Sequence, residues 1–199
     1  MNLYERYPQL NICEKDIENA LLLMVDTYKK GGKILACGNG GSAADADHIV
    51  GELMKGFLKA RKVTDERIPQ ELREKLQGAL PAISLSAHAS LMTATINDND
   101  ADMVFAQQVY GFAKTDDLLI AISTSGNSKN VVNAVKVAKA LGVKVIALTS
   151  ETGGVLNGLA DITICAPSTE TYKIQEYHLP IYHYLCAKIE NEFFDKEIV

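Results

Sequence analysis

The stretch that decides the fold is Ile34-Leu-Ala-Cys-Gly-Asn-Gly-Gly-Ser-Ala-Ala-Asp-Ala-Asp-His-Ile-Val-Gly-Glu52. Its apolar start, residues 34–37, predicts a buried strand, and the alanine-rich part from Ser42 to about Phe57 predicts a helix. A turn of Gly, Asn and Ser between the two leaves backbone N–H groups unpaired at the positive end of the helix dipole. Phosphate groups bind well at such a helix start, so the stretch indicates an α/β fold with an anion site.

The same predicted helix carries His48 and Glu52, which are four residues apart and therefore project from one face. An anion site and a general acid/base pair on one helix predict a phosphorylated substrate that reacts close to the pair. The alternative at this spacing is a surface pair without a chemical role, which is the usual fate of His and Glu four residues apart.

The rest of the chain alternates predicted helices and strands. Helices are expected at 12–30, 101–114, 130–141 and 153–159 and in a last segment ending at 194, and strands at 33–37, 82–85, 117–122, 143–148 and 161–165. This alternation predicts one domain over residues 1–199, a three-layer αβα sandwich with a five-stranded parallel sheet of the flavodoxin-like type. Ligands of such sheets bind at the carboxyl ends of the strands.

Composition narrows the function classes. The net charge of −5 argues against nucleic acid as a partner. Residues 1–10 contain no apolar secretory core, and no apolar run reaches the length of a membrane span. The four cysteines form no Cys-x-x-Cys pair, which predicts reduced thiols in a cytoplasmic protein.

Residues 59–77 hold six basic and four acidic residues and are interrupted by Pro69. A solvated loop with a short surface helix is the favoured interpretation of this charged insert. A lid is the alternative, because the segment leaves the predicted helix that carries Glu52.

A second polar loop, Ser123-Thr-Ser-Gly-Asn-Ser128, follows the strand predicted at 117–122. Hydroxyls and backbone N–H groups can satisfy the oxygens of a phosphate without Lys or Arg. An ordinary helix N-cap would need only one or two of these four hydroxyls. The loop therefore favours phosphate binding over simple capping.

The first glycine loop, residues 38–43, also fits the dinucleotide pattern G-x-G-x-x-A. That interpretation requires an acidic residue at the end of the next strand to hold a ribose. The next predicted strand ends in Ser84-Leu-Ser86 instead, so no nucleotide cofactor is expected.

Five features together resemble the sugar-isomerase (SIS) domain family and, within it, the phosphoheptose isomerases: the turn at 38–42, the pair His48 and Glu52, Asn97-Asp98, the loop at 123–128, and Gln175-Glu176 with His183. The resemblance covers nearly the whole chain except about residues 59–80. The hydroxyl loop marks the superfamily, whereas the combination of His48, Glu52, Gln175 and His183 is more specific.

The resemblance implies an aldose–ketose isomerase that converts sedoheptulose 7-phosphate into D-glycero-D-manno-heptose 7-phosphate through an enediol, for synthesis of bacterial surface heptose. Glu52 would be the base that removes the proton beside the carbonyl, and His183 the acid that serves the oxygens. The residues that the resemblance assigns to substrate binding are Asn39, Gly40, Gly41, Ser42, Asn97, Asp98, Ser123, Thr124, Ser125, Ser128 and Gln175.

Some members of the family bind zinc, at the positions of His48, Glu52, Gln175 and His183, and this donor set suits the metal. Gln175 and His183 lie roughly 12 Å apart along an ideal helix, so their side chains would have to converge or come from different subunits. Pro180 lies between them and predicts a kink or a late start of the last helix. The resemblance also implies a homotetramer with sites at subunit interfaces.

Three other functions compete with this one. A non-catalytic SIS protein that binds a protein partner, such as a replication-initiation regulator, would lack the acid/base residues, whereas Glu52 and His183 are both present. A sugar-phosphate sensor would carry a DNA-binding module, for which the chain has neither length nor basic surface. An isomerase of another sugar phosphate stays open, because side-chain types do not encode the length of the sugar.

Overall fold

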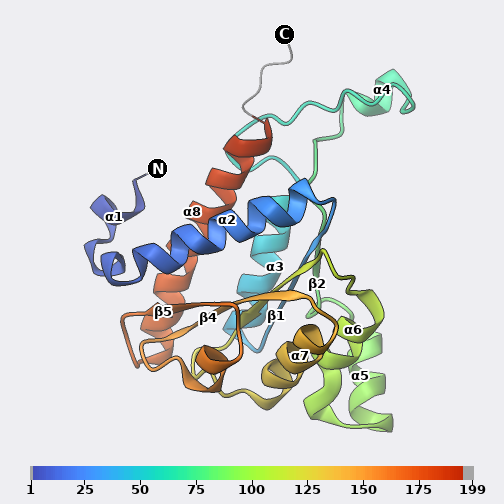
Figure 1. Ribbon diagram of the computed structural model, residues 1–199. Helices are drawn as coiled ribbons and strands as arrows, with labels where there is room; N and C mark the ends of the chain where they lie inside the picture. The colour runs from blue at the N-terminus through green and yellow to red at the C-terminus, as the bar shows by residue number, and fades with distance from the viewer. Residues whose placement is uncertain (1, 195–199) are drawn as a thin grey trace.

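The computed structural model describes residues 2–194, which form a five-stranded, all-parallel sheet in the order β2-β1-β3-β4-β5 (Figure 1). The strands are β1 Ile34–Gly38, β2 Ala82–Ser84, β3 Leu118–Ile122, β4 Lys144–Ser150 and β5 Ile162–Ala166. The α/β class and the five-stranded parallel sheet predicted from the sequence are confirmed.

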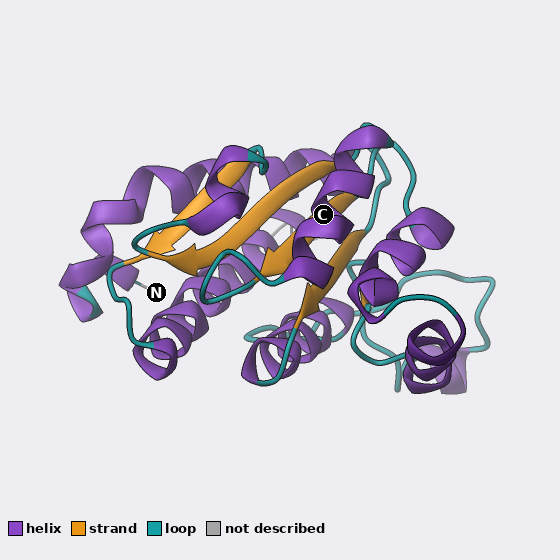
Figure 2. Cartoon of the chain, turned by 90° about the horizontal axis from the view of Figure 1, so that it is seen from below, coloured by secondary structure: helices purple, strands orange, loops and turns teal. Residues whose placement is uncertain are grey.

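Helices cover both faces of the sheet (Figure 2). The α-helices are α1 Leu3–Arg6, α2 Glu14–Lys29, α3 Gly41–Met54, α4 Gln70–Arg73, α5 Ala89–Asp98, α6 Val104–Phe112, α7 Lys129–Ala140 and α8 Thr171–Phe194. Three 3-10 segments, Pro8–Cys13, Ala101–Met103 and Gly154–Gly158, complete the list for the described residues. No helix within residues 2–194 is both long and apolar enough to cross a bilayer.

Two hydrophobic cores lie on opposite faces of the sheet, and β1 contributes to both. Ile34 and Ala36 pack with side chains of α2, α3 and α8, whereas Leu35 and Cys37 pack with side chains of α6 and α7. Alternate residues of a strand point to opposite faces, so a strand covered on both sides must be apolar throughout. This requirement explains why the run at 34–37 contains no polar residue.

The strand register places the two polar loops side by side. Gly38, the last residue of β1, pairs with Ile122, the last residue of β3, and Ile122 pairs in turn with Leu148 of β4. The glycine turn and the hydroxyl loop therefore leave the same edge of the sheet at the same height, as expected for parallel strands.

Several helices differ from the prediction. Residues 89–98, for which no helix was predicted, form α5, and 101–114 and 153–159 are partly or wholly 3-10 turns. Thr93, Thr95 and Ile96 give α5 a weak intrinsic helix propensity. Its packing against α6 supplies the stability that local sequence does not show.

The late helix start that Pro180 suggested is wrong, because α8 begins at Thr171 and passes through Pro180 as one helix. Proline removes one N–H and its bond, a local loss that packing can offset. Pro180 is buried, and Ile181, Tyr182 and Leu185 beside it belong to the core. Gln175 and His183 consequently sit on one continuous helix.

The charged insert projects from the end of α3 and carries the short helix α4, away from the loops at the sheet edge (Figure 1). Most of its side chains are exposed, in agreement with the surface prediction. Since α3 begins at the glycine turn and ends at the insert, the insert does not cover the hydroxyl loop of its own chain. Arg61 departs from this pattern, because its side chain is fully buried.

Candidate functional site

A cavity of about 320 Å³ opens where the two loops meet at the carboxyl edge of the sheet, and we call it the serine pocket. Its size is within the range of small-ligand sites. The lining residues come from the β1–α3 turn, the β3–α7 loop and the first turns of α8, and they are Asn39, Gly40, Gly41, Ser42, Ile122, Ser123, Thr124, Ser128, Thr171 and Gln175.

Three helices begin at this pocket. Gly40 is the N-cap of α3, Ser128 is the N-cap of α7, and Thr171 is the first residue of α8. No lining side chain carries a formal charge, so the positive potential comes from helix dipoles and free N–H groups. Such a pocket favours an anion that accepts several hydrogen bonds, as a phosphate does.

The pocket depends on two glycine positions. Gly40 has a φ of +55°, which disfavours side chains with a Cβ. A Cβ on Gly41 would lie 2.4 Å from Nε2 of Gln175, so the missing side chain leaves room for the amide to approach the turn. Gln175 thus becomes part of the pocket wall.

The hydroxyls of the loop have different roles. Ser128 stands at the N-cap of α7, but its side chain makes no capping bond and instead lies 3.0 Å from Oγ of Ser123. The Oγ of Ser125 accepts from the N–H of Asn127 at 3.1 Å and shapes the turn. Ser123, Thr124 and Ser128 line the pocket, whereas Ser125 does not.

Asn130 is a site residue that sequence reasoning missed. Its amide and that of Asn39 exchange two hydrogen bonds of 2.9 Å, which tie the hydroxyl loop to the glycine turn. Asn130 lies two residues into a helix, and nothing in the local sequence indicates a partner 91 positions away. Only the register of β1 with β3 brings the two asparagines together.

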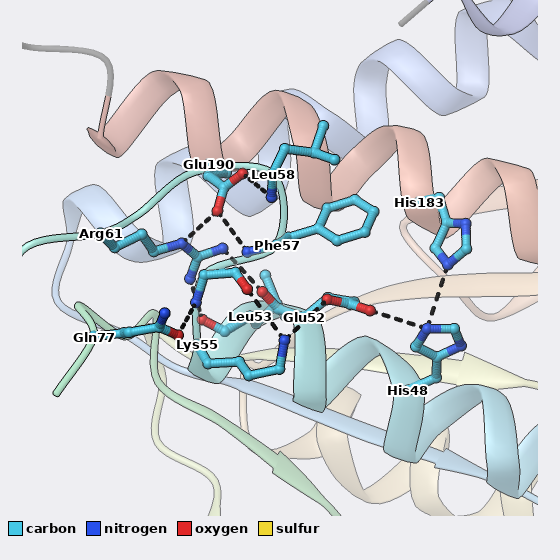
Figure 3. Close-up of polar contacts among 11 residues, drawn as sticks. His48, Glu52, Leu53, Lys55, Phe57, Leu58, Arg61, Gln77, His183 and Glu190 are labelled. Atoms are coloured by element: carbon cyan, nitrogen blue, oxygen red, sulfur yellow. Dashed lines mark hydrogen bonds and ion pairs between the residues drawn. The ribbon is translucent and has the colours of Figure 1, made fainter. Parts of the chain in front are cut away.

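A second group of polar side chains, the His–Glu cluster, consists of His48 and Glu52 on α3 and His183 on α8 (Figure 3). Nε2 of His48 lies 3.0 Å from Oε1 of Glu52 and 3.4 Å from Nε2 of His183. The candidate base and acid, drawn from opposite ends of the chain, therefore lie together within one molecule.

Two further residues, also missed at the sequence level, orient the cluster. The Tyr182 hydroxyl lies 3.2 Å from Oδ1 of Asp45 and 3.0 Å from Nδ1 of His48. Because the hydroxyl donates its only proton to the carboxylate, the network assigns Nδ1 of His48 as the donor to the tyrosine oxygen. The only signal of this network in the sequence is the spacing of Asp45 and His48, which lie nearly one helical turn apart.

Protonation states follow from burial. Burial, with help from the neighbouring His48, lowers the pKa of His183 below its ordinary value, so this imidazole is neutral at neutral pH. Burial raises the pKa of Asp45, against the opposing effect of the Tyr182 hydrogen bond and of His48. The cluster thus places a neutral imidazole beside a carboxylate, a suitable pair for moving protons.

The cluster also has the composition of a cation site. Ligand atoms of His48, Glu52 and His183 all lie within 4.8 Å of one another. Oε2 of Glu52 is buried without a hydrogen-bond partner within the described part of the chain, and its ion-pair partner, Nζ of Lys55, lies 4.0 Å away. With Nδ1 of His48 engaged by Tyr182, the Nε2 lone pair of His48 faces the Glu52 carboxylate, an arrangement that a bound cation stabilises.

Gln175 does not lie in this cluster. It lines the serine pocket, eight residues and roughly 12 Å before His183 on the same continuous helix. Three members of the metal set implied by the family resemblance thus lie in the His–Glu cluster, and a ligand role of Gln175 stays a prediction.

Asn97 and Asp98 also lie outside both groups. They are the last residues of α5, both exposed, and the Asn97 amide donates to the Asp98 carboxylate at 2.7 Å. Neither lines the serine pocket. Within one chain they do not contact the serine pocket, and their role in substrate binding stays a prediction.

His178 and His88 are likewise separate from the site. His178 is fully buried on α8 with Nε2 3.2 Å from the carbonyl oxygen of Thr149, and burial lowers its pKa to about 4. Nδ1 of His88 lies 2.8 Å from Oε1 of Gln108.

The serine pocket and the His–Glu cluster are connected by two helices. Both α3 and α8 begin at the pocket, and they pack against each other and carry the cluster further along. From Ser42 to His48 the path along α3 is roughly 9 Å. A ligand anchored by an anionic group in the pocket can therefore extend along this seam with its other end at the acid/base residues.

Fold and site together define an α/β protein with an uncharged polar pocket at three helix starts, beside a cluster of two histidines and a glutamate. The SIS domain family matches residues 10–150, and the chain belongs to this family. A phosphoheptose isomerase of Aliarcobacter butzleri is 46% identical over 92% of this chain and 88% of its own length. The chain therefore falls, within the SIS domain family, among the phosphoheptose isomerases.

Solved structures agree with this assignment. The phosphoheptose isomerase of Neisseria gonorrhoeae superposes with a TM-score of 0.79 at 35% identity, covering 94% of this chain and 91% of that one. The phosphoheptose isomerase of Francisella tularensis gives a TM-score of 0.78 at 34% identity, with 94% and 90% covered.

Proposed function

We propose that this protein is a phosphosugar isomerase that converts sedoheptulose 7-phosphate into D-glycero-D-manno-heptose 7-phosphate, a precursor of surface heptose. The observation that carries the proposal is the meeting of Glu52 and His183 in one cluster on two helices that both start at an anion pocket. The relatives named phosphoheptose isomerase support the same reaction class.

The serine pocket would bind the phosphate and fix the position of the sugar chain. Ser123, Thr124 and Ser128 offer hydroxyls, and the starts of α3 and α7 offer backbone N–H groups. Because this anchor is remote from the reacting carbons, its binding energy can serve to orient them. Gln175 would contact the part of the sugar next to the phosphate.

At the other end, Glu52 would remove the C1 proton of the ketose, and electrons would move through the C1–C2 bond to the carbonyl oxygen. The neutral imidazole of His183 would supply a proton to that oxygen, which gives the enediol. The proton taken from C1 is then returned to C2, and the C1 hydroxyl loses its proton, which completes the aldose. Each proton taken by a side chain is given back within one turnover.

Zinc fits the His–Glu cluster because the cluster combines two imidazole nitrogen donors with one carboxylate, all within 4.8 Å of one another. A zinc ion held by His48, Glu52 and His183 would act as a Lewis acid toward the substrate carbonyl. We further propose a cytoplasmic homotetramer in which a neighbouring subunit brings Asn97 and Asp98 toward the sugar.

The test is turnover of sedoheptulose 7-phosphate by the purified protein, with and without a chelator, compared with Glu52→Gln. We expect isomerisation by the wild type and a loss of about a hundredfold or more in kcat for the variant, since it keeps the shape and loses the base. Phosphate affinity should be the same in both proteins.

Two results would contradict the proposal. Equal turnover by wild type and Glu52→Gln would exclude the base role, and no turnover by a folded, phosphate-binding wild type would favour a non-catalytic SIS protein. A faster reaction with a six-carbon ketose phosphate would change the substrate but keep the reaction class.

A further inference from the structure

Arg61 is the one side chain of the charged insert that points into the protein and is completely buried (Figure 3). Its Nε donates to Oε1 of Glu190 at 2.7 Å, and both side chains are fully inaccessible. The guanidinium also lies 4.9 Å from the centre of the Phe194 ring. A fully desolvated cation in a segment otherwise exposed to water calls for an explanation.

The other donors of Arg61 reach the end of α3. Its two terminal nitrogens donate to the backbone carbonyl oxygens of Leu53 at 2.6 Å and of Glu52 at 2.9 Å. Carbonyl groups in the last turn of a helix have no intrahelical partner, and a cation there also complements the helix dipole. Arg61 therefore caps α3 at the residue that carries the candidate base.

Glu190 connects the same point to α8. It lies seven residues after His183, two helical turns away and on nearly the same face. Its carboxylate also accepts from the N–H groups of Phe57 and Leu58, each at 2.8 Å. Burial alone would raise the pKa of Glu190, but these N–H groups and Arg61 outweigh it and keep the pKa below its ordinary value.

Phe57 extends the connection to the site itself. The N–H of Phe57 is held by Glu190, and its ring centre lies 5.4 Å from that of His183. The insert is also closed at its base, because the N–H of Gly78 donates to the carbonyl oxygen of Arg61 at 2.7 Å. One buried ion pair thus joins the end of α3, the base of the insert and the His183 region of α8.

We propose that Arg61, together with Glu190, is a positioning residue that fixes the backbone of Glu52 relative to His183. The proposal rests on the proposed function, since it assigns these two residues to the chemistry. Buried ion pairs contribute little net stability compared with well-packed apolar pairs, so geometry is the better explanation of this one. Arginine suits this position because its planar guanidinium directs three separate nitrogens at acceptors on different segments, which the single nitrogen of lysine does not.

The first test is Arg61→Lys, which keeps the charge near Glu190 and loses the fork that holds Glu52 and Leu53. We expect kcat for sedoheptulose 7-phosphate to fall about tenfold or more, with KM and phosphate affinity within about twofold, because the serine pocket is at the other end of α3. Lys29→Met is the matched control: the exposed pair of Lys29 with Glu192 also joins a helix to α8, and its loss should change neither constant.

The second test separates position from stability. Arg61→Met/Glu190→Gln removes both buried charges, so it should recover much of the thermal stability that Arg61→Met alone loses. Its kcat should stay low, because the carbonyl group of Glu52 loses its Arg61 donor and that of Leu53 keeps only the N–H of Leu80. Recovery of wild-type kcat together with stability would overturn the positioning role, as would an unchanged kcat in Arg61→Lys.

A spectroscopic measurement does not depend on turnover. In Arg61→Lys the imidazole ¹⁵N signals of His48 and His183 should shift, whereas that of His88, which contacts Gln108 and Phe112 of α6, should not. Unshifted His48 and His183 signals would contradict the proposal. If wild type and Lys29→Met both failed to isomerise the substrate, the proposed function would be wrong, and these signals would still report on the positioning.

Discussion

The serine pocket and the His–Glu cluster differ in how the chain builds them. The pocket consists of short runs that directly follow β1 and β3, together with the start of α8, and no lining side chain is charged. The cluster joins ionisable side chains up to 135 positions apart, on two helices. The proposed anion binding therefore relies on backbone geometry fixed by the sheet, whereas the proposed acid/base chemistry relies on how two helices pack.

This difference separates binding from catalysis in space and in mechanism. Substitutions in the loops should change KM and leave the acid/base pair in place. Substitutions that alter the packing of α3 on α8 should change kcat. Of the three predictions below, the first perturbs the serine pocket and the last the His–Glu cluster. The second concerns α8, which contributes residues to both regions.

The largest effect is expected from Gly126→Ala in the hydroxyl loop. Gly126 has a φ of +66°, and a Cβ there would lie 2.1 Å from the carbonyl oxygen of Gly153, a backbone atom that cannot move aside. Backbone strain and overpacking together should cost about 3 kcal/mol of stability. Thermal unfolding should show this loss, and KM should rise at least tenfold as the loop is displaced.

Gly158→Ala is the matched control for Gly126→Ala, because nothing lies within 4 Å of a Cβ at that position. It should change neither Tm nor KM appreciably. A wild-type KM in folded Gly126→Ala would show that the loop does not hold the phosphate.

A smaller effect concerns pH and α8. His178 has a pKa near 4 in the folded protein and near 6.5 when unfolded, so the unfolded chain binds its proton first as the pH falls. Its contribution to stability is complete above about pH 6.5 and decreases as the pH falls toward 4, by about 2 kcal/mol at pH 5. Denaturant titrations at pH 7 and pH 5 should show this loss in the wild type.

His178→Met should remove that part of the pH dependence while keeping an apolar contact in the core. If the variant loses as much stability between pH 7 and pH 5 as the wild type, protonation of His178 is not the cause. Phosphate binding at pH 7 should be unchanged, because His178 does not line the serine pocket.

The smallest effect is expected from Tyr182→Phe, which removes one hydroxyl from the network around the His–Glu cluster. The variant loses the contacts to Asp45 and Nδ1 of His48, worth about 1 kcal/mol. We expect kcat to fall about fivefold with an unchanged KM, measured by steady-state kinetics. Tyr110→Phe, at an exposed tyrosine, is the control. A change in KM alone would place Tyr182 in binding instead.

The fold could be predicted because its signals are local. Apolar runs such as 34–37 and 118–122 show strands buried on both faces, and glycine turns show where the strands end. The helix α5 was not predicted, since Thr93, Thr95 and Ile96 are weak helix formers and its stability comes from α6. The late helix start predicted from Pro180 was wrong for the opposite reason. Proline locally disfavours a helix, but the core packing around Pro180 outweighs this preference.

The candidate site was predicted in part. The hydroxyl loop and the pair His48 and Glu52 are contiguous or one turn apart, so the pattern alone indicates them. Asn130, Tyr182 and Arg61 carry no such signal, because each acquires its contact from a residue far away in the sequence. Gln175 was grouped with His183 by resemblance, yet a rise of 1.5 Å per residue along a continuous helix places the two in different parts of the site.

By itself, the sequence determined the order of the five strands along the chain, and it predicted a ligand site at their carboxyl edge with an anion-binding turn next to an acid/base pair. Those features depend on periodicity and turn chemistry, which act over a few residues. Only the tertiary structure decided that His183 joins Glu52, that Gln175 joins the serine pocket, and that Arg61 is buried under the end of α3. These contacts arise when α3 and α8 pack on the sheet, and side-chain packing between distant segments leaves no periodic trace in the chain.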